Sequence, residues 1–89
     1  MKHIQFAKKF SKNYLIRISR NPSRKKQFDE RYEMFISGIR GYPLFDHALT
    51  RNMKGLRSFS IGGDLRIVYR ETETHYEFLD VGTHNQVYK

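Results

Sequence analysis

Hydrophobic residues recur at a helical period in the first part of the chain. Phe10, Tyr14 and Ile18 lie four positions apart, and basic residues fill much of the opposite face, which predicts an amphipathic helix over 8–20. The dipeptide Asn21-Pro22 is expected to end this helix, because proline disfavours helical geometry in the residue before it. We expect the aromatic stripe to face the core.

A second amphipathic pattern follows this break. Aromatic residues at helical spacing predict a helix over 25–37, with Ser23 as its N-cap and Gly38 as its C-terminal stop. Ahead of the first helix, the apolar alternation of residues 3–6 predicts a short strand. Two helices separated by so short a break predict a helical hairpin.

The hydrophobic period changes to two in the second half of the chain. Residues 39–55 are interrupted by glycine and proline, which indicates a long irregular connection of a kind that often serves function. Alternation then predicts strands over 56–61, 65–71 and 75–81, the first two joined by a tight turn at Gly62-Gly63-Asp64. These strands would form an antiparallel meander.

This order of elements predicts a single α+β domain over residues 1–89, with the helices on one face of the sheet. The other face of an antiparallel sheet is free to carry polar side chains. Alternation puts Leu65, Ile67 and Tyr69 on the core face of the central strand. It puts Arg66, Val68 and Arg70 on the other, with the two arginines about 13 Å apart at roughly 3.3 Å per residue.

The charge of the chain is strongly positive and unevenly distributed. The formal net charge is +8, and residues 1–28 hold nine Lys or Arg and no Asp or Glu. Such an excess on a small domain attracts polyanions, and nucleic acid is the foremost of them. A solvated cationic surface and an acidic protein partner are the alternative interpretations.

Several classes of protein are disfavoured by what the sequence lacks. There is no Cys, so neither a disulfide framework nor a thiolate metal site is expected, which suits a reducing cytoplasm. No apolar run approaches the length of a membrane span, and no signal peptide is recognisable. The four His are scattered, at positions 3, 47, 75 and 84, without metal-ligand spacing. No nucleophile elbow or P-loop occurs, and no cofactor is expected.

A ribonuclease that needs no metal requires fewer parts. A base deprotonates the ribose 2′-OH, a cation stabilises the phosphate as it gains negative charge, and an acid protonates the leaving 5′-oxygen. Histidine can be base or acid at neutral pH, and arginine and lysine supply the cation. Any one of these residues is more often an ordinary surface residue; their concentration beside one sheet is what favours the interpretation. The candidates are His47, His84, Asp64, Lys54, Arg57 and Arg66.

The ordered set of these residues resembles the RelE/YafQ group of bacterial and archaeal toxins. The matching blocks are Asp46-His47-Ala48-Leu49, Met53-Lys54-Gly55-Leu56-Arg57-Ser58, Gly63-Asp64-Leu65-Arg66-Ile67-Val68-Tyr69 and Gly82-Thr83-His84, with Tyr88 beyond them. The resemblance implies the toxin of a type II toxin–antitoxin pair with a microbial-RNase-like fold. It also implies cleavage of mRNA in the ribosomal A site and neutralisation by an antitoxin, with a toxin that is monomeric alone and hetero-oligomeric with that antitoxin.

The resemblance also implies roles for single residues. His47, Asp64 and His84 match residues counted as catalytic in YafQ-like toxins, although the assignment of base and acid stays open. Tyr88 matches a C-terminal aromatic that contacts the scissile nucleotide, and Arg66 an arginine that contacts the phosphate. RNA-binding candidates are Lys54, Arg57, Arg70 and Arg51.

The sequence departs from the family pattern at two positions. Ser60 and Asp80 stand where YafQ-like toxins carry a histidine and an arginine. Arg66 would then supply the missing cation. Two alternative functions remain: a ParE-like toxin that acts on DNA gyrase without cutting RNA, and an RNA-binding module without turnover. The histidine pair argues against the ParE class, which lacks it.

Overall fold

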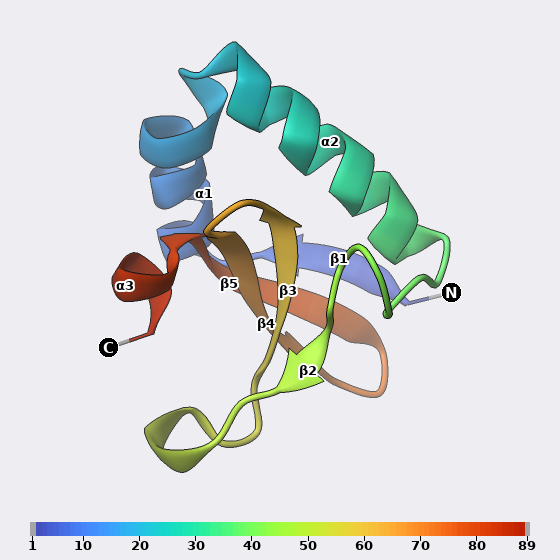
Figure 1. Ribbon diagram of the computed structural model, residues 1–89. Coiled ribbons are helices and arrows are strands. Elements are labelled where there is room, and N and C mark those ends of the chain that lie inside the picture. Colours follow the sequence, from blue (N-terminus) through green and yellow to red (C-terminus); the bar gives the residue numbers. More distant parts are fainter. Residues whose placement is uncertain (1, 89) are drawn as a thin grey trace.

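The fold is a helical hairpin packed on a five-stranded sheet (Figure 1). A computed structural model describes residues 2–88 of the chain. Its elements are β1 (His3–Phe6), α1 (Lys8–Tyr14), a π-helical turn η1 (Leu15–Ser19), α2 (Pro22–Ile36), β2 (His47–Ala48), a 3-10 turn η2 (Arg51–Met53), β3 (Arg57–Gly62), β4 (Leu65–Glu71), β5 (His75–Thr83) and α3 (His84–Val87). The α+β class predicted from the element order is confirmed.

The strand order is β1-β5-β4-β3-β2, so the first and last strands of the chain are neighbours. The hairpins β3–β4 and β4–β5 are antiparallel, as the predicted meander requires, whereas β1 pairs with β5 in parallel through His3↔His75 to Phe6↔Phe78. Neither β2 nor α3 was predicted from the sequence. Each has four residues or fewer, too few to show a period.

The two long helices begin and end close to the predicted positions. The first continues past α1 as the π-helical turn η1 and ends at Ser19. The second begins at Pro22, earlier than predicted, and its N-cap is Asn21 instead of Ser23. The side-chain oxygen of Asn21 accepts a hydrogen bond of 3.1 Å from the backbone N–H of Arg24. Proline suits the first helical position because its missing N–H is not needed there.

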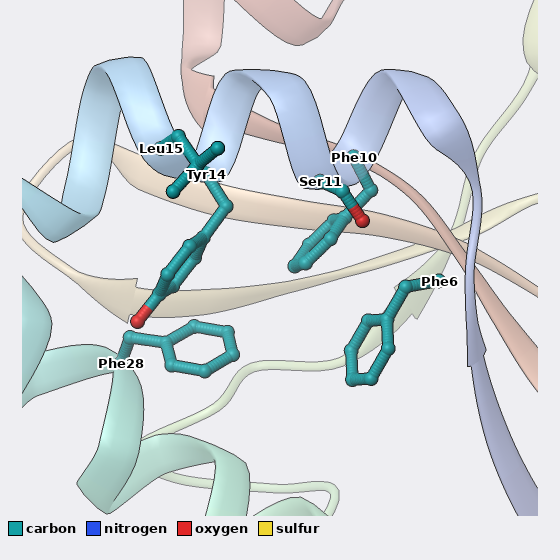
Figure 2. Close-up of a pocket in the computed structure, with 6 residues that line it drawn as sticks. All are labelled: Phe6, Phe10, Ser11, Tyr14, Leu15 and Phe28. Carbon is teal, nitrogen blue, oxygen red and sulfur yellow. The ribbon is translucent and has the colours of Figure 1, made fainter.

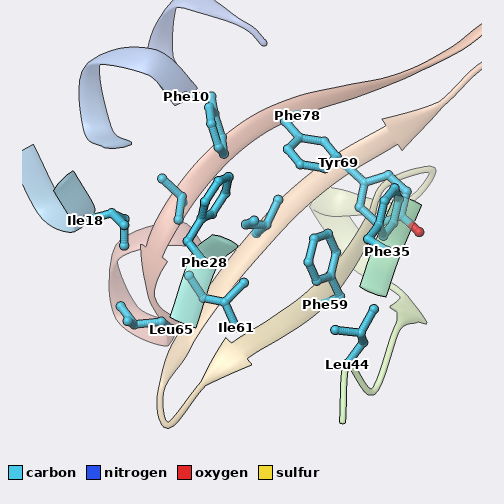
Figure 3. Packing of buried hydrophobic residues seen from close by; sticks show 12 residues of the cluster. Phe10, Ile18, Phe28, Phe35, Leu44, Phe59, Ile61, Leu65, Tyr69 and Phe78 are labelled. Atoms are coloured by element: carbon cyan, nitrogen blue, oxygen red, sulfur yellow. The ribbon is translucent and has the colours of Figure 1, made fainter. Parts of the chain in front are cut away.

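Aromatic rings fill the layer between the helices and the sheet (Figure 3). The Phe35 ring stacks on Phe59 with 4.7 Å between the ring centroids and meets Phe78 edge-on at 5.5 Å. These three side chains are almost fully buried, as are Ile67 and Tyr69 on the same face of β4. The aromatic stripes of the helices therefore form the core, as their periodicity predicted.

An apolar hollow lies between α1 and α2 (Figure 2). It has a volume of about 330 Å³ and is lined by Phe6, Phe10, Ser11, Tyr14, Leu15 and Phe28. None of these side chains is an acid, base or cation that could act on a phosphodiester at neutral pH. The hollow is therefore no candidate for an active site, and the polar groups must be sought on the other face of the sheet.

Candidate active site on the open face of the sheet

Strand register defines which side chains share the face away from the helical hairpin. Phe59 pairs with Ile67, and both point into the core, so their neighbours in the alternation point the other way. The outward row at the centre of the sheet is Ser58, Val68 and Asp80, and the next row is Ser60, Arg66 and Gly82. We call this surface the open face.

A bulge in β5 places Asp80 on the open face. Val68 pairs with Asp80 and Tyr69 with Phe78, which leaves Leu79 as the extra residue. The Asp80 carboxylate is 5% exposed and accepts a hydrogen bond of 2.7 Å from Asn13 of α1. Asp80 therefore helps to hold α1 against the last strand.

The residues Gly82, Thr83 and His84 lie where the end of β5 meets the side chains of Arg17 and Gln86. A Cβ atom on Gly82 would lie 2.7 Å from Nη1 of Arg17, which also donates a hydrogen bond of 2.9 Å to the carbonyl of Val81. Thr83 is the N-cap of α3, and its backbone N–H donates to the side chain of Gln86 at 2.8 Å. Together these contacts present His84 as the first residue of α3.

Tyr88 connects α3 with the centre of the open face. Its hydroxyl donates a hydrogen bond of 2.6 Å to Oγ of Ser58, a fully buried residue. Its ring lies edge-on to the imidazole of His84, with 4.6 Å between the ring centroids. The position of the His84 ring is therefore tied to the sheet through Tyr88.

His47 borders the same group from β2. It pairs with Ser58 across the β2–β3 ladder, and directly opposed residues project from the same face. Nδ1 of His47 is 2.9 Å from the carbonyl oxygen of Phe45, so this nitrogen carries the proton. The neutral ring then offers Nε2 as an acceptor. The structure thus brings His47, His84 and Tyr88 together around Ser58.

The aspartate that precedes His47 has a structural role. The Asp46 side chain is fully buried and accepts from Arg57, with Nε at 2.8 Å and Nη2 at 2.7 Å. The Tyr69 hydroxyl donates to its other oxygen. The pKa of the Tyr69 hydroxyl is raised, mainly by burial and secondly by the hydrogen bond to the Asp46 carboxylate. The hydrogen bond to Asp46 also raises the pKa of Arg57. Asp46 and Arg57 therefore fix the start of β2 from the core side of the sheet.

Replacing Asp46 with alanine is expected to lower the free energy of unfolding by about 2–3 kcal/mol. The change removes charge-assisted hydrogen bonds and leaves the buried hydroxyl of Tyr69 without an acceptor. Arg57 is partly exposed, which keeps the loss below that of a fully buried pair. Urea unfolding measures it.

The matched control is Asp29→Ala, which breaks the exposed pair of Asp29 with Lys25 on α2. Its cost should stay below about 0.5 kcal/mol. Equal stability losses for the two variants would contradict the anchoring role of Asp46.

The two arginines predicted on the open face differ in their partners. Arg66 has no hydrogen-bond or ion-pair partner among residues 2–88, and its Nε is buried without one. Arg70 instead forms an ion pair with Glu77 at 2.9 Å. The cation of Arg66 is therefore available to a phosphate, whereas that of Arg70 is partly neutralised.

The loop between β2 and β3 adds a hollow beside Tyr88. This hollow has a volume of about 280 Å³, and its wall includes Leu49, Thr50, Arg51, Met53 and Tyr88. Arg51 has a φ of 58°, in the left-handed region that residues with a Cβ seldom adopt. Lys54 follows on the exposed side of the same loop. Arg51 and Tyr88 thus line the same hollow.

Asp64 lies apart from the histidine of β2. It is exposed in the β3–β4 turn and lines a different hollow, together with Arg24, Gln27 and Thr83. The turn is four residues beyond Ser58 along β3, which corresponds to about 13 Å. The structure therefore does not bring Asp64 together with His47. Asp64 lines the same hollow as Thr83, the residue that precedes His84.

Within residues 2–88, no three His, Asp or Glu side chains gather in a way that could hold a metal ion. In the same part of the chain, no helix is long and apolar enough to cross a membrane.

Comparison with known proteins gives consistent matches. The family model of YafQ, a bacterial toxin of type II toxin-antitoxin systems, matches residues 2–89. YafQ from E. coli strain BL21(DE3) is 20% identical, covers 100% of both chains and superposes with a TM-score of 0.81. A metal-bound toxin from Helicobacter pylori is 22% identical over 99% of this chain and 100% of its own, with a TM-score of 0.78.

A third solved structure also resembles the fold, whereas no match is found among curated proteins. The YoeB dimer from Staphylococcus aureus is 20% identical over 93% of this chain and 97% of its own, with a TM-score of 0.71. At such identities the likeness to solved structures establishes the fold, while the family model covers nearly the whole sequence.

Proposed function

Because the chain belongs to the YafQ family of bacterial toxins of type II toxin–antitoxin systems, we propose that it is an endoribonuclease that cuts mRNA on the ribosome. The observation that carries this proposal is the arrangement of the two histidines at the two ends of the Tyr88–Ser58 hydrogen bond: His47 pairs with Ser58, and His84 contacts the Tyr88 ring. One imidazole at each end of this bond, with an unpaired arginine in the next row, matches the needs of phosphodiester transesterification.

The proposed reaction uses the RNA's own hydroxyl as nucleophile. The ribose 2′-oxygen attacks the adjacent phosphorus while its proton passes to the base. The bond between phosphorus and O5′ then breaks, and the acid protonates O5′. The products are a 2′,3′-cyclic phosphate and a 5′-hydroxyl end. No metal ion is needed for either proton transfer.

The tautomer of His47 supports its assignment as the base. Its Nδ1–H is held by the Phe45 carbonyl, so Nε2 is the nitrogen free to accept the 2′-OH proton. His84, exposed at the start of α3, is then the acid that protonates the leaving oxygen. We assign no proton transfer to Asp64, because the turn that carries it lies apart from His47.

The cations and the aromatic ring complete the proposed site. Arg66 stabilises the negative charge that develops on the phosphate, and a guanidinium suits this because it can donate two parallel hydrogen bonds. Tyr88 positions the scissile nucleotide with its ring, since its hydroxyl is already bonded to Ser58. Arg51 and Lys54 hold the RNA backbone beside this ring, whereas Arg57 is committed to Asp46 and Arg70 to Glu77.

The basic surface and the family suggest the partners. The excess charge of residues 1–28 would attract ribosomal RNA through a salt-dependent interaction. YafQ of E. coli has been crystallised in a complex with DinJ. We propose that a cognate antitoxin likewise binds this chain, a monomer when alone, and that the toxin acts in the cytoplasm.

Expression of the chain without an antitoxin is expected to arrest growth by halting protein synthesis. Amino-acid incorporation should fall before DNA synthesis does, and new mRNA ends should carry a 5′-hydroxyl. A matched strain expressing the His84→Ala variant should keep growing. Inhibited DNA supercoiling with intact mRNA would instead identify a ParE-like toxin and overturn the ribonuclease proposal.

A further inference from the structure

A further hollow lies at the edge of β3, beyond the pairing of β3 with the first residue of β2. The loop that precedes β2 covers this edge, and the backbone N–H of Ser60 donates to the carbonyl of Leu44 at 2.7 Å. Arg31 of α2 fastens the loop through Nη1, which donates to the carbonyls of Pro43 at 3.0 Å and Ser60 at 3.4 Å. The hollow has a volume of about 370 Å³, and Arg31, Arg66, Tyr42 and Phe45 line it.

Two aromatic rings are held outside the core at this hollow. Tyr42 is 81% exposed and Phe45 is 59% exposed, and the rings meet edge-on with 5.7 Å between their centroids. Phe45 has a φ of 50°, in the left-handed region that is costly for a bulky residue. Neither burial in the core nor backbone preference explains why these rings face solvent, so they form an aromatic surface that is open to a ligand.

The hollow adjoins the candidate active site through two residues. Arg66 lines the hollow and stands one row from Ser58, which corresponds to about 6.6 Å along the strand. Phe45, the second exposed ring, supplies the carbonyl that fixes the tautomer of His47. A chain of nucleotides with its scissile bond beside Tyr88 would therefore reach the hollow within about one phosphate step.

We propose that this hollow is a subsite for the unpaired nucleotide next to the scissile bond. Its base packs against Tyr42 and Phe45. The phosphate that joins it to the scissile nucleotide is held by Arg66, and the guanidinium of Arg31 lines the same hollow. This rests on the proposed ribonuclease function and extends it to the choice of cleavage site. Stacking platforms of aromatic rings combined with arginine are how proteins hold single-stranded nucleic acid.

The chemistry of the hollow favours RNA over a protein segment. Both charged side chains that line it are arginines, and no Asp or Glu of the described residues contributes to its wall. The buried Nε of Arg66 has no hydrogen-bond partner among those residues, so an anion bound at this guanidinium would accept a hydrogen bond that no protein group accepts. An apolar peptide would bury these cations without neutralising them.

Photocrosslinking tests the occupant directly. The probe is a set of 2′-O-methyl RNA decamers, each with one 5-iodouridine; the methyl group removes the nucleophile and so prevents cleavage. We expect one position of the set to crosslink to Tyr42 or Phe45 and a neighbouring position to crosslink to Tyr88. Crosslinks that avoid Tyr42 and Phe45 in the whole set would overturn the subsite.

Kinetics of the double variant Tyr42→Leu/Phe45→Leu provide the second test. On translating ribosomes, kcat/KM should fall about tenfold or more through KM, because one stacked base is lost. The preference for one nucleotide beside the scissile bond should also disappear. Phe6→Leu, which changes a half-exposed ring of β1 that packs against the helical hairpin, is the matched control and should leave both unchanged.

The outcomes separate the subsite from the proposed function. Unchanged KM and unchanged site preference in the double variant would remove the subsite and leave the ribonuclease proposal standing. A wild-type protein that cuts no mRNA yet crosslinks at Tyr42 or Phe45 would end the ribonuclease proposal and keep an RNA-binding subsite. A double variant that cuts normally but escapes its antitoxin would make the loop a protein-binding surface and overturn the subsite.

Discussion

Replacing His84 with alanine is expected to lower the rate of mRNA cleavage by about two orders of magnitude or more, the usual contribution of a general acid or base. The fold should survive, because His84 is exposed and its ring contacts Tyr88 without filling the core. Single-turnover cleavage on programmed ribosomes measures the chemical step. The matched control is His75→Ala at the far end of β5, whose ring bonds to Thr72 and should be dispensable.

The identity of the acid can be tested with a substrate that carries sulfur in place of the leaving O5′. A thiolate leaves without prior protonation, so the His84→Ala variant should cut this substrate nearly as fast as the wild-type protein. His47→Ala should remain slow on both substrates, because the 2′-OH still needs a base. A rescue of His47→Ala instead of His84→Ala would reverse the two assignments, and full activity of both variants would end the histidine mechanism.

Replacing Arg66 with alanine is expected to lower the single-turnover rate by about two to three orders of magnitude. This is the usual effect of removing one donor that stabilises developing negative charge. Arg66 has no acceptor in the described residues, so its loss breaks no internal ion pair and should cost little stability. Lysine at this position should restore only part of the rate, because it keeps the charge and loses the planar fork.

Comparison with Arg70→Ala separates catalysis from docking. Arg70 lies on the same face of β4 but is paired with Glu77, so its loss should change the rate only a few-fold. Ribosome association of Arg66→Ala, measured by co-sedimentation, should change far less than its cleavage rate. Equal losses in association and in cleavage would make Arg66 a docking residue.

The periodicity of the sequence was sufficient for the main elements of the fold. Alternation predicted a strand over 65–71, and β4 has this range. The pattern was clear because the side chains that face the core are apolar and those that face outward are polar, except Val68. The helical spacing likewise located both long helices, with only the start of α2 displaced by the Asn21 cap. The pairing of β1 with β5 could not be predicted from the hydrophobic pattern. The period of that pattern indicates which face of the sheet a side chain takes, but not which strand lies next to it.

The sequence predicted which residues belong to the candidate site better than it predicted how they are arranged in space. The motifs named His47, His84 and Tyr88, which the structure places together. They also named Asp64, which lies away from His47 but lines a hollow with Thr83, and Arg57, whose guanidinium is held by Asp46. The signal for that ion pair was the acidic residue before His47, but sequence alone does not reveal a partner eleven residues away. Ser58 carried no signal, because its contact with Tyr88 depends on the return of α3 over the sheet.

The sequence by itself determined the element types, the aromatic core, the excess of positive charge and the blocks that mark a YafQ toxin. These are properties of local spacing and composition, and short-range preference fixes them. Only the tertiary structure decided which polar groups form contacts that stabilise the fold and which remain available to bind RNA. Asp46, Arg57, Asp80 and Arg17 form internal contacts, whereas Arg66 keeps its cation free among the described residues. The physical reason is that a charged side chain becomes structural or available according to the partner that packing places within hydrogen-bonding reach.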